Sequence, residues 1–289
     1  MTAETPSGFA PVAGLPDILS LTRREDGRYR VFQPSESAEG RDVVFSGQLL
    51  GQAMMASDLA AGSTKDIRSV HAVFARAGSY TQPIELEVDS MHAGRTWASD
   101  TVTAIQGDRL LTRATVLLNT VDDDLMRHEP AMPDVIAPDT LSPGEAQVFP
   151  GAELRPIPDE PTFGNVPVTR AWHRYAQKID SQAANQAILG WATCGTLIGL
   201  AMRAHRDTIS IADAHRTLST GVIAHTMHFL ERIDVAQWLL IEEAATKAAN
   251  GRVFGEGRVF TQKGALVATY HQDAMAKAAP THLDPSRSL

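Results

Sequence analysis

Twice along this chain, a long apolar segment precedes a series of short segments rich in Val, Ile, Leu and Thr. The two apolar segments are Phe45 to Gly62 and Ala183 to Ala204. If each forms a helix, apolar side chains cover its whole circumference and leave no polar face for solvent. The chain therefore has to bury two helices on nearly all sides, which few arrangements of secondary structure can do.

The ends of the first helix are marked by two residues. Ser46 is available as the N-cap, because its hydroxyl can accept a hydrogen bond from a backbone N–H of the first turn. Gly62 is available as the residue that ends the helix in a left-handed conformation. These two signals predict a helix of about four turns.

Four strand-like segments follow each helix. In the first half they are Ser69–Ala75, Ile84–Met91, Thr96–Ile105 and Leu110–Asn119. In the second half they are Gly221–Leu230, Trp238–Thr246, Gly251–Phe260 and Leu266–Asp273, and a further strand, Val168–Tyr175, precedes the helix. Gly-Arg and Gly-Asp pairs separate the last strands of the first half, as hairpin turns do.

Individual residues also correspond between the halves. The matching positions are His71 with His225, Gly94-Arg95 with Gly251-Arg252, and Gln106-Gly107 with Gln262-Lys263-Gly264. Their offsets of 154, 157 and 156 residues keep one register through small insertions, so we infer an internal duplication. Because His71 and His225 occupy equivalent places, we expect each to make the same structural hydrogen bond in its own half of the chain.

The strands follow one another without intervening helices, which favours antiparallel over parallel pairing. An antiparallel sheet that curls around one helix buries all of its faces, and we therefore expect an α+β chain with two such units, a double hotdog. Nine of the sixteen prolines lie between Val121 and Pro167 and interrupt every periodic pattern. We expect domains at residues 1–120 and 168–278, a Pro-rich linker at 121–167 and a tail at 279–289.

Composition excludes several classes of protein. The net charge of −8, with 34 acidic against 26 basic residues, argues against broad nucleic-acid binding. A single cysteine excludes an internal disulfide framework. The first sixteen residues lack the basic and apolar regions of a signal peptide, so we expect a cytoplasmic location.

One stretch has the length of a membrane span. Ala183 to Met202 contains no charged residue over twenty positions. Asn185 and Gln186 lie within it, however, and their amides would need partners in hydrocarbon. We therefore expect a helix buried inside the fold and no membrane span.

Motifs for other chemistries are absent from the sequence. His225 and His228 are three residues apart on an expected strand, which turns them to opposite faces and disfavours a metal site. Gly255-Glu256-Gly257 leads into a strand where a dinucleotide fingerprint would open a helix. No Gly-x-Ser-x-Gly is present, which argues against a serine esterase of the α/β-hydrolase type.

Several short motifs occur in a characteristic order. In the first half they are Val44–Ala53, Ser69–Gly78, Gly94–Trp97 and Ala104–Gly107. In the second half they are Leu189–Ala192, His225–Phe229, Glu243, Phe260–Ala268 and Gln272. Together, from about Gly40 to Lys277, they resemble the acyl-CoA thioesterase II family. This resemblance implies a double hotdog that hydrolyses acyl-CoA with neither a cofactor nor a covalent intermediate.

The resemblance also implies where the active site lies. The family orients water with an Asp on the second helix, a Thr on a following strand and a Gln near the C-terminus. The Gln falls on Gln272, the Asp position holds Cys194 and the Thr position holds Val222, with Thr220 two residues earlier. Because a general base contributes ~10²–10⁴-fold, Asp58 on the first helix is an alternative candidate for that role.

Further residues are candidates for substrate binding. Gly47 and Gln48 open the first helix, where free backbone N–H groups favour negative charge on a thioester carbonyl. His71 and Arg76 belong to the motifs shared with the family. We expect an acyl-CoA substrate, a homo-oligomer, and no metal or cofactor. A hydratase would need a His and Asp pair that we do not find, whereas a non-catalytic acyl-CoA-binding protein is the remaining alternative.

Overall fold

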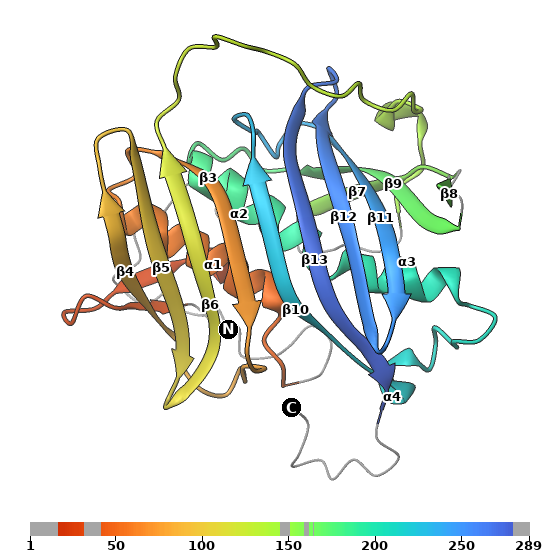
Figure 1. The fold of residues 1–289 in the computed structure, drawn as a ribbon, viewed down its shortest axis with the longest axis horizontal. Coiled ribbons are helices and arrows are strands. Elements are labelled where there is room, and N and C mark those ends of the chain that lie inside the picture. The colour runs from red at the N-terminus through yellow and green to blue at the C-terminus, as the bar shows by residue number, and fades with distance from the viewer. Residues whose placement is uncertain (1–16, 32–41, 145–150, 159–161, 164, 280–289) are drawn as a thin grey trace, which may run out of the picture. The chain divides into compact units, whose positions relative to one another are not determined.

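The computed structural model describes residues 17–31, 42–144, 151–158, 162–163 and 165–279 (Figure 1). The chain divides into two compact units. Unit 1 comprises Met1–Asp123 and Lys178–Trp191, and unit 2 comprises Asp124–Gln177 and Ala192–Leu289. Unit 1 thus includes a segment that the sequence-based division assigned to the second domain. The reason is packing, because Gln186 in that segment accepts the backbone N–H of Ile67 at 3.1 Å and donates to its carbonyl oxygen at 2.7 Å.

Unit 1 is an antiparallel arrangement in the order β1-β2-β4-β5-β6-β3. The strands are β1 (Leu21–Arg23), β2 (Tyr29–Val31), β3 (Asp66–Phe74), β4 (Glu85–Ala93), β5 (Trp97–Gln106) and β6 (Arg109–Asn119), preceded by a 3-10 turn at Asp17–Leu19. The four longer strands confirm the prediction from the sequence. β1 and β2 were not predicted, because three residues are too few to show a period.

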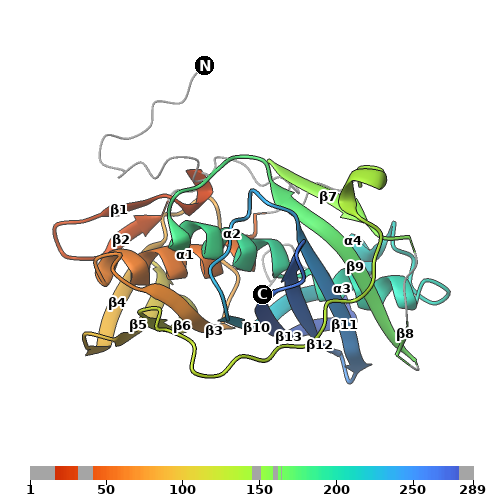
Figure 2. The ribbon, with the colours of Figure 1, turned by 90° about the horizontal axis from the view of Figure 1, so that it is seen from above.

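Helix α1 (Ser46–Ala60) packs against β3, β4, β5 and β6, as Figure 2 shows. Every residue from Gly47 to Asp58 is buried, which confirms the all-round burial expected from its composition. The N-cap prediction is wrong by one residue. The cap is Phe45, whose carbonyl oxygen accepts the first helical N–H at 3.0 Å, and no side chain caps the helix. Gly62 follows the C-cap with φ of +75°, as predicted.

Unit 2 is antiparallel in the order β10-β13-β12-β11-β9-β7, and β8 pairs with β9. The strands are β7 (Ala152–Pro156), β8 (Thr162–Phe163), β9 (Val166–Tyr175), β10 (Leu218–Phe229), β11 (Leu239–Ala249), β12 (Arg252–Thr261) and β13 (Leu266–Ala278). β7 and β8 lie within the expected linker. Pairing with β9 satisfies their backbone groups, which a local sequence pattern does not reveal.

The second apolar helix is broken in two, which corrects the prediction of one continuous helix. α2 (Gln182–Thr193) and α3 (Thr196–Ala204) are separated by Cys194 and Gly195. Gly195 has φ of +95°, a left-handed conformation that glycine adopts without steric cost. The span Gln182–Ala204 is long and apolar enough to cross a membrane, yet 61% of its most apolar window is buried inside the structure. α3 packs against β9, β11, β12 and β13.

The two units share one topology, which supports the duplication. The order β4-β5-β6-β3 in unit 1 corresponds to β11-β12-β13-β10 in unit 2. β3 and β10 carry bulges at Arg68 and Ile223, 155 positions apart. In this alignment the residue of unit 1 that corresponds to His225 is Val70, not His71. The expected shared histidine hydrogen bond is therefore wrong, since His71 is exposed and His225 is fully buried.

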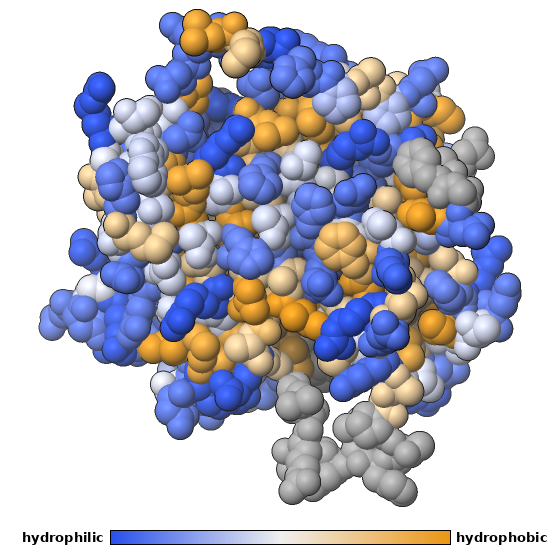
Figure 3. Space-filling model, viewed as in Figure 1, coloured by the Kyte–Doolittle hydropathy of each residue, from blue (hydrophilic) through white to orange (hydrophobic). Residues whose placement is uncertain are grey.

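The strands of each unit have a buried face and an exposed face. In β12, buried Val253, Gly255 and Gly257 alternate with exposed Phe254 and Glu256. Figure 3 shows hydrophilic residues mixed with smaller hydrophobic groups across the visible face. A site that must exclude water therefore belongs on the helix-facing side of the strands.

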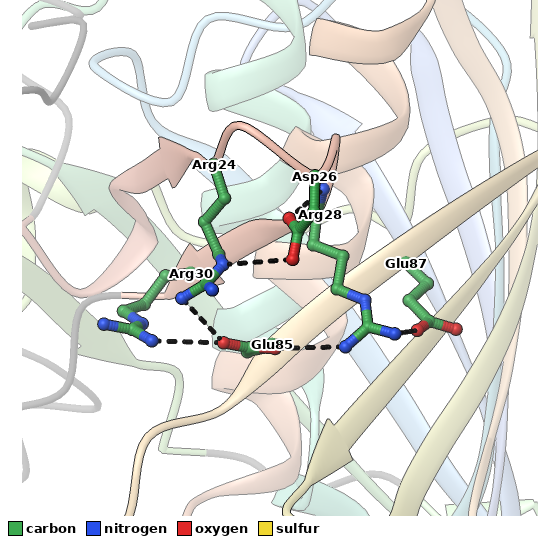
Figure 4. A network of polar contacts seen from close by, with 6 residues as sticks. All are labelled: Arg24, Asp26, Arg28, Arg30, Glu85 and Glu87. Carbon is green, nitrogen blue, oxygen red and sulfur yellow. Dashed lines mark hydrogen bonds and ion pairs between the residues drawn. The ribbon is translucent and has the colours of Figure 1, made fainter.

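The short hairpin of β1 and β2 is held to β4 by ion pairs (Figure 4). Glu85 lies 3.1 Å from Arg24, 3.4 Å from Arg28 and 3.1 Å from Arg30. Arg28 also pairs with Glu87 at 2.6 Å and Arg24 with Asp26 at 3.4 Å, completing a cluster of three cations and three anions. Because these charges balance, we interpret the cluster as an attachment of the hairpin and not as an anion site.

Candidate active site

Gln272 lies on the helix-facing side of β13 and is 1% exposed. Its Oε1 accepts the backbone N–H of Gly195 at 2.7 Å. Its Nε2 has no hydrogen bond of normal geometry to any residue that the structure describes. The amide is therefore held by its oxygen while its two N–H donors stay available, an arrangement that is costly in a buried site unless a ligand or water uses them.

The break between α2 and α3 brings two of the predicted site residues together. Cys194, at the break, is 2% exposed, and the residue after it bonds to Gln272. Val222 on β10 is half-buried and pairs with Ala274, two residues beyond Gln272, so it shares the face of that side chain. Cys194 carries no carboxylate and Val222 has no polar side-chain atom. The acid and hydroxyl that the family resemblance implies are thus missing from these positions.

His225 is directly opposite Gln272 in the pairing of β10 with β13. It is fully buried, and its ring stacks on Tyr270 with centroids 5.5 Å apart. Burial lowers the pKa of His225 to about 4, whereas the adjacent amide of Gln272 acts weakly in the opposite direction. The ring is therefore neutral at pH 7, and it lines the site as an uncharged polar surface.

A second polar cluster adjoins Gln272, and the sequence analysis did not assign it to the site. Glu243 on β11 is 6% exposed and accepts hydrogen bonds from Tyr270 Oη at 2.5 Å and from Thr196 Oγ1. Thr196 directly follows Gly195, and Tyr270 is two residues before Gln272 on the same face of β13. The signals in the sequence were the place of Glu243 among the motifs shared with the family and its position in the apolar beginning of β11.

Burial raises the pKa of Glu243, and the hydroxyls of Thr196 and Tyr270 and the charge of Arg203 oppose that shift. Burial also raises the pKa of Tyr270 well above its ordinary value of 10, with the charge of Glu243 adding to the effect. The neighbouring Glu242 faces the other way and is neutralised by Arg170 at 2.6 Å and by Arg258. Of these two consecutive glutamates, Glu243 is the one whose carboxylate is held by hydroxyl groups.

The remaining predicted site residues belong to unit 1. Asp58 on α1 is 4% exposed and accepts a hydrogen bond from Ser63 at 2.7 Å, and burial raises its pKa. Gly47 and Gln48 lie in the first turn of α1, and both are buried. His71 and Arg76 are exposed. All five belong to unit 1, whereas Gln272 belongs to unit 2.

Unit 1 lacks an amide at the place equivalent to Gln272. Val70 pairs with Val116 in unit 1 where His225 pairs with Gln272 in unit 2. Within the described residues, no three His, Cys, Asp or Glu side chains are grouped as a metal site would require. The chemistry that we can derive therefore depends on Gln272 and its neighbours in unit 2.

Comparisons with known proteins match both halves of the chain to one family. The family model described as the acyl-CoA thioesterase N-terminal domain matches residues 33–119, and that of the C-terminal domain matches residues 122–276. Acyl-CoA thioesterase 2 of Haemophilus influenzae is 22% identical over 284 residues, covering 91% of this chain and 98% of the relative. Acyl-coenzyme A thioesterase 8 of Homo sapiens is 22% identical over 264 residues, covering 82% and 81%.

Solved structures show the same fold. Acyl-CoA thioesterase II TesB2 from Mycobacterium marinum superposes with a TM-score of 0.77 at 23% identity, covering 92% of this chain and 99% of that one. A hot dog fold protein of unknown function from Alicyclobacillus acidocaldarius gives 0.69 at 20% identity, covering 92% and 98%. Since the two domain matches together cover most of the chain and the C-terminal one alone spans more than half of it, this double-hotdog chain belongs to the acyl-CoA thioesterase II family.

Proposed function

We propose that this protein hydrolyses fatty acyl-CoA to a free acid and CoA by direct attack of water on the thioester. The observation that carries the proposal is the buried amide of Gln272, fixed through Oε1 and open at Nε2. The family to which the chain belongs and the names of its relatives support this reaction.

The orientation of the amide follows from its hydrogen bond. The N–H of Gly195 needs an acceptor, so the oxygen arm of the amide, and not Nε2, meets the helix break. Nε2 then donates to one lone pair of a water molecule and leaves the other free to attack the thioester carbon. A positioned water of this kind avoids the entropic cost of bringing the nucleophile to the carbonyl during the reaction.

Thiol release from acyl-CoAs of graded chain length tests the proposal. We expect turnover by the native protein, and we expect Gln272→Ala to lose about 2–4 kcal/mol of transition-state stabilisation, by analogy with a lost oxyanion donor. Binding of a non-hydrolysable acyl-CoA thioether should persist in the variant. Gln237→Ala is the matched control, because Gln237 is an exposed glutamine in a loop of the same unit.

Two outcomes would contradict the proposal. Unchanged turnover in Gln272→Ala would remove Gln272 from the mechanism. A native protein that binds the thioether but releases no thiol from any acyl-CoA would favour the alternative function, a non-catalytic acyl-CoA-binding protein.

We also propose a homo-oligomer. In the described part of the chain, β4 pairs with β2 only at Glu85 and Leu86, so the rest of this edge of β4 is open. Met91 is 56% exposed and Trp97 47% exposed next to this edge, and exposed edges favour pairing with another copy. Light scattering of the native protein tests the oligomeric state, with a monomer as the contrary result.

A cytoplasmic location is proposed from the single free cysteine and is tested by cell fractionation.

A further inference from the structure

We propose that Glu243 is the proton acceptor of this site and receives the proton of the attacking water through the hydroxyl of Thr196. The inference rests on the proposed function, because it supplies the base that Cys194 and Val222 do not. Thr196 lies directly after the residue that holds Gln272, so the hydroxyl and the water-orienting amide are positioned by the same helix break.

The hydrogen bonds of this cluster can form both when Glu243 is ionised and when it is protonated. Thr196 Oγ1 contacts Glu243 Oε1 and lies 3.0 Å from the carbonyl oxygen of Thr193. When Glu243 is ionised, Thr196 donates its single proton to the carboxylate. When Glu243 is protonated, it donates to Thr196, which then donates to Thr193. Tyr270 donates to Glu243 in both states, so the change requires only rotation of one hydroxyl.

The proton transfer balances with the hydrolysis. One O–H bond of water breaks and its proton passes to Thr196 Oγ1, while the proton of Thr196 passes to Glu243. The water oxygen bonds to the thioester carbon, and the C–S bond then breaks. The proton returns by the same route from Glu243 to the thiolate of CoA. Glu243 ends the cycle ionised, as it began.

The charged and titratable neighbours suit this role. Burial raises the pKa of Glu243 from its ordinary value, which makes the carboxylate a stronger base. Arg203 on α3 limits that rise. His225 on β10 is neutral near pH 7 and Tyr270 on β13 stays protonated, so neither competes for the proton.

The register of β11, β12 and β13 brings Glu243 and Tyr270 together. Glu243 pairs with Gly257 across β11 and β12, and Gly257 pairs with Tyr270 across β12 and β13. A Cβ at Gly257 would lie 2.5 Å from Tyr270 Oη and closer still to its ring. The tyrosine therefore reaches Glu243 only because the intervening strand has no side chain at this point.

Unit 1 contains a comparable hydroxyl–carboxylate pair without the amide, but its acid lies on β5, which corresponds to β12 and not to β11. Aligning the helices through Leu50 and Leu189 makes Ser57 equivalent to Thr196, and Ser57 donates to the buried carboxylate of Asp100 at 2.6 Å. Asp100 pairs with Val116, which occupies the place of Gln272. This hydroxyl–carboxylate pair has no water-orienting group beside it, and it supplies a matched control.

The experiment compares kcat, KM and their pH profiles for the full-length native protein and four variants. We expect Glu243→Gln and Thr196→Val each to lower kcat by ~10²–10⁴-fold with little change in KM, and Thr196→Ser to retain the native rate. We expect the acidic limb of the kcat profile, displaced upward from the range of an ordinary glutamate, to disappear in Glu243→Gln. Asp100→Asn should change neither kcat nor the profile.

Thiol release by native protein separates this proposal from the proposed function. If the native protein releases no thiol, the proposed function fails. If it does, and Glu243→Gln keeps the native kcat and acidic limb, only the role of Glu243 fails. Should Glu243→Gln be misfolded by circular dichroism, the Thr196 pair decides: equal rates for Thr196→Val and Thr196→Ser would overturn the relay.

Discussion

Gly257→Ala is expected to destabilise unit 2 by about 3–5 kcal/mol. A Cβ at this position would meet Tyr270 Oη at 2.5 Å, about 1 Å inside ordinary contact distance, with the ring carbons still closer. Overpacking of this kind costs about 1–3 kcal/mol. Displacing the ring also breaks the bond from Tyr270 to Glu243, and a hydrogen bond to a charged group is worth about 1.5–3 kcal/mol.

Urea unfolding followed by circular dichroism measures this effect. The matched control is Gly221→Ala on β10, where a Cβ meets no atom within 4 Å. We expect that variant to gain about 0.5 kcal/mol, because alanine loses less backbone entropy in a strand than glycine does. The comparison separates a specific collision from a general effect of replacing a strand glycine.

A double-mutant cycle identifies the collision partner. In a Tyr270→Ala background the ring is absent, so Gly257→Ala should cost close to nothing beyond the first substitution. The same cost for Gly257→Ala in both backgrounds would refute the reasoning, since the clash would then lie elsewhere.

Two further predictions concern the neighbouring residues. The pKa of His225 is about 4 in the folded protein against 6.5 in the unfolded chain, so its contribution to stability is fully present above pH 6.5 and falls by roughly 3 kcal/mol as the pH drops to 4. Burial lowers the pKa of His173 in the same way, so the loss of unfolding free energy over that range should become smaller in His225→Phe without disappearing, and an unchanged loss would assign it to other groups. Restoring the acid and hydroxyl of the family with Cys194→Asp and Val222→Thr is expected to raise thiol release, since it supplies a carboxylate and a hydroxyl next to Gln272. A folded double variant that binds acyl-CoA but releases no more thiol would contradict this expectation.

The elements that follow from local residue order were predictable. α1 and the four long strands of unit 1 begin and end within a few residues of the expected positions. Helical and alternating periods depend only on neighbours in the chain, so a single sequence contains them. The hairpin of β1 and β2 has no such period, and its attachment through Glu85 depends on residues more than fifty positions apart.

The break at Gly195 could not be predicted from the order of neighbouring residues alone. The segment from Ala183 to Ala204 was interpreted as one helix because it is apolar throughout, although the weak helix formers Thr193 to Thr196 lie within it. The left-handed glycine matters because its N–H meets Gln272, 77 positions further along the chain. The partner of that N–H lies so far along the chain that the local sequence does not indicate it.

The sequence by itself determined that two apolar helices must each be enclosed by antiparallel strands, and the resemblance that it carries pointed to Gln272. Only the tertiary structure decided which polar groups meet beside that amide. Glu243, Gly257 and Tyr270 come together through the register of three strands, and the bulge at Ile223 turns His225 inward. Because a shift of one residue moves a side chain to the opposite face of a sheet, composition and spacing alone could not assign these residues to the site.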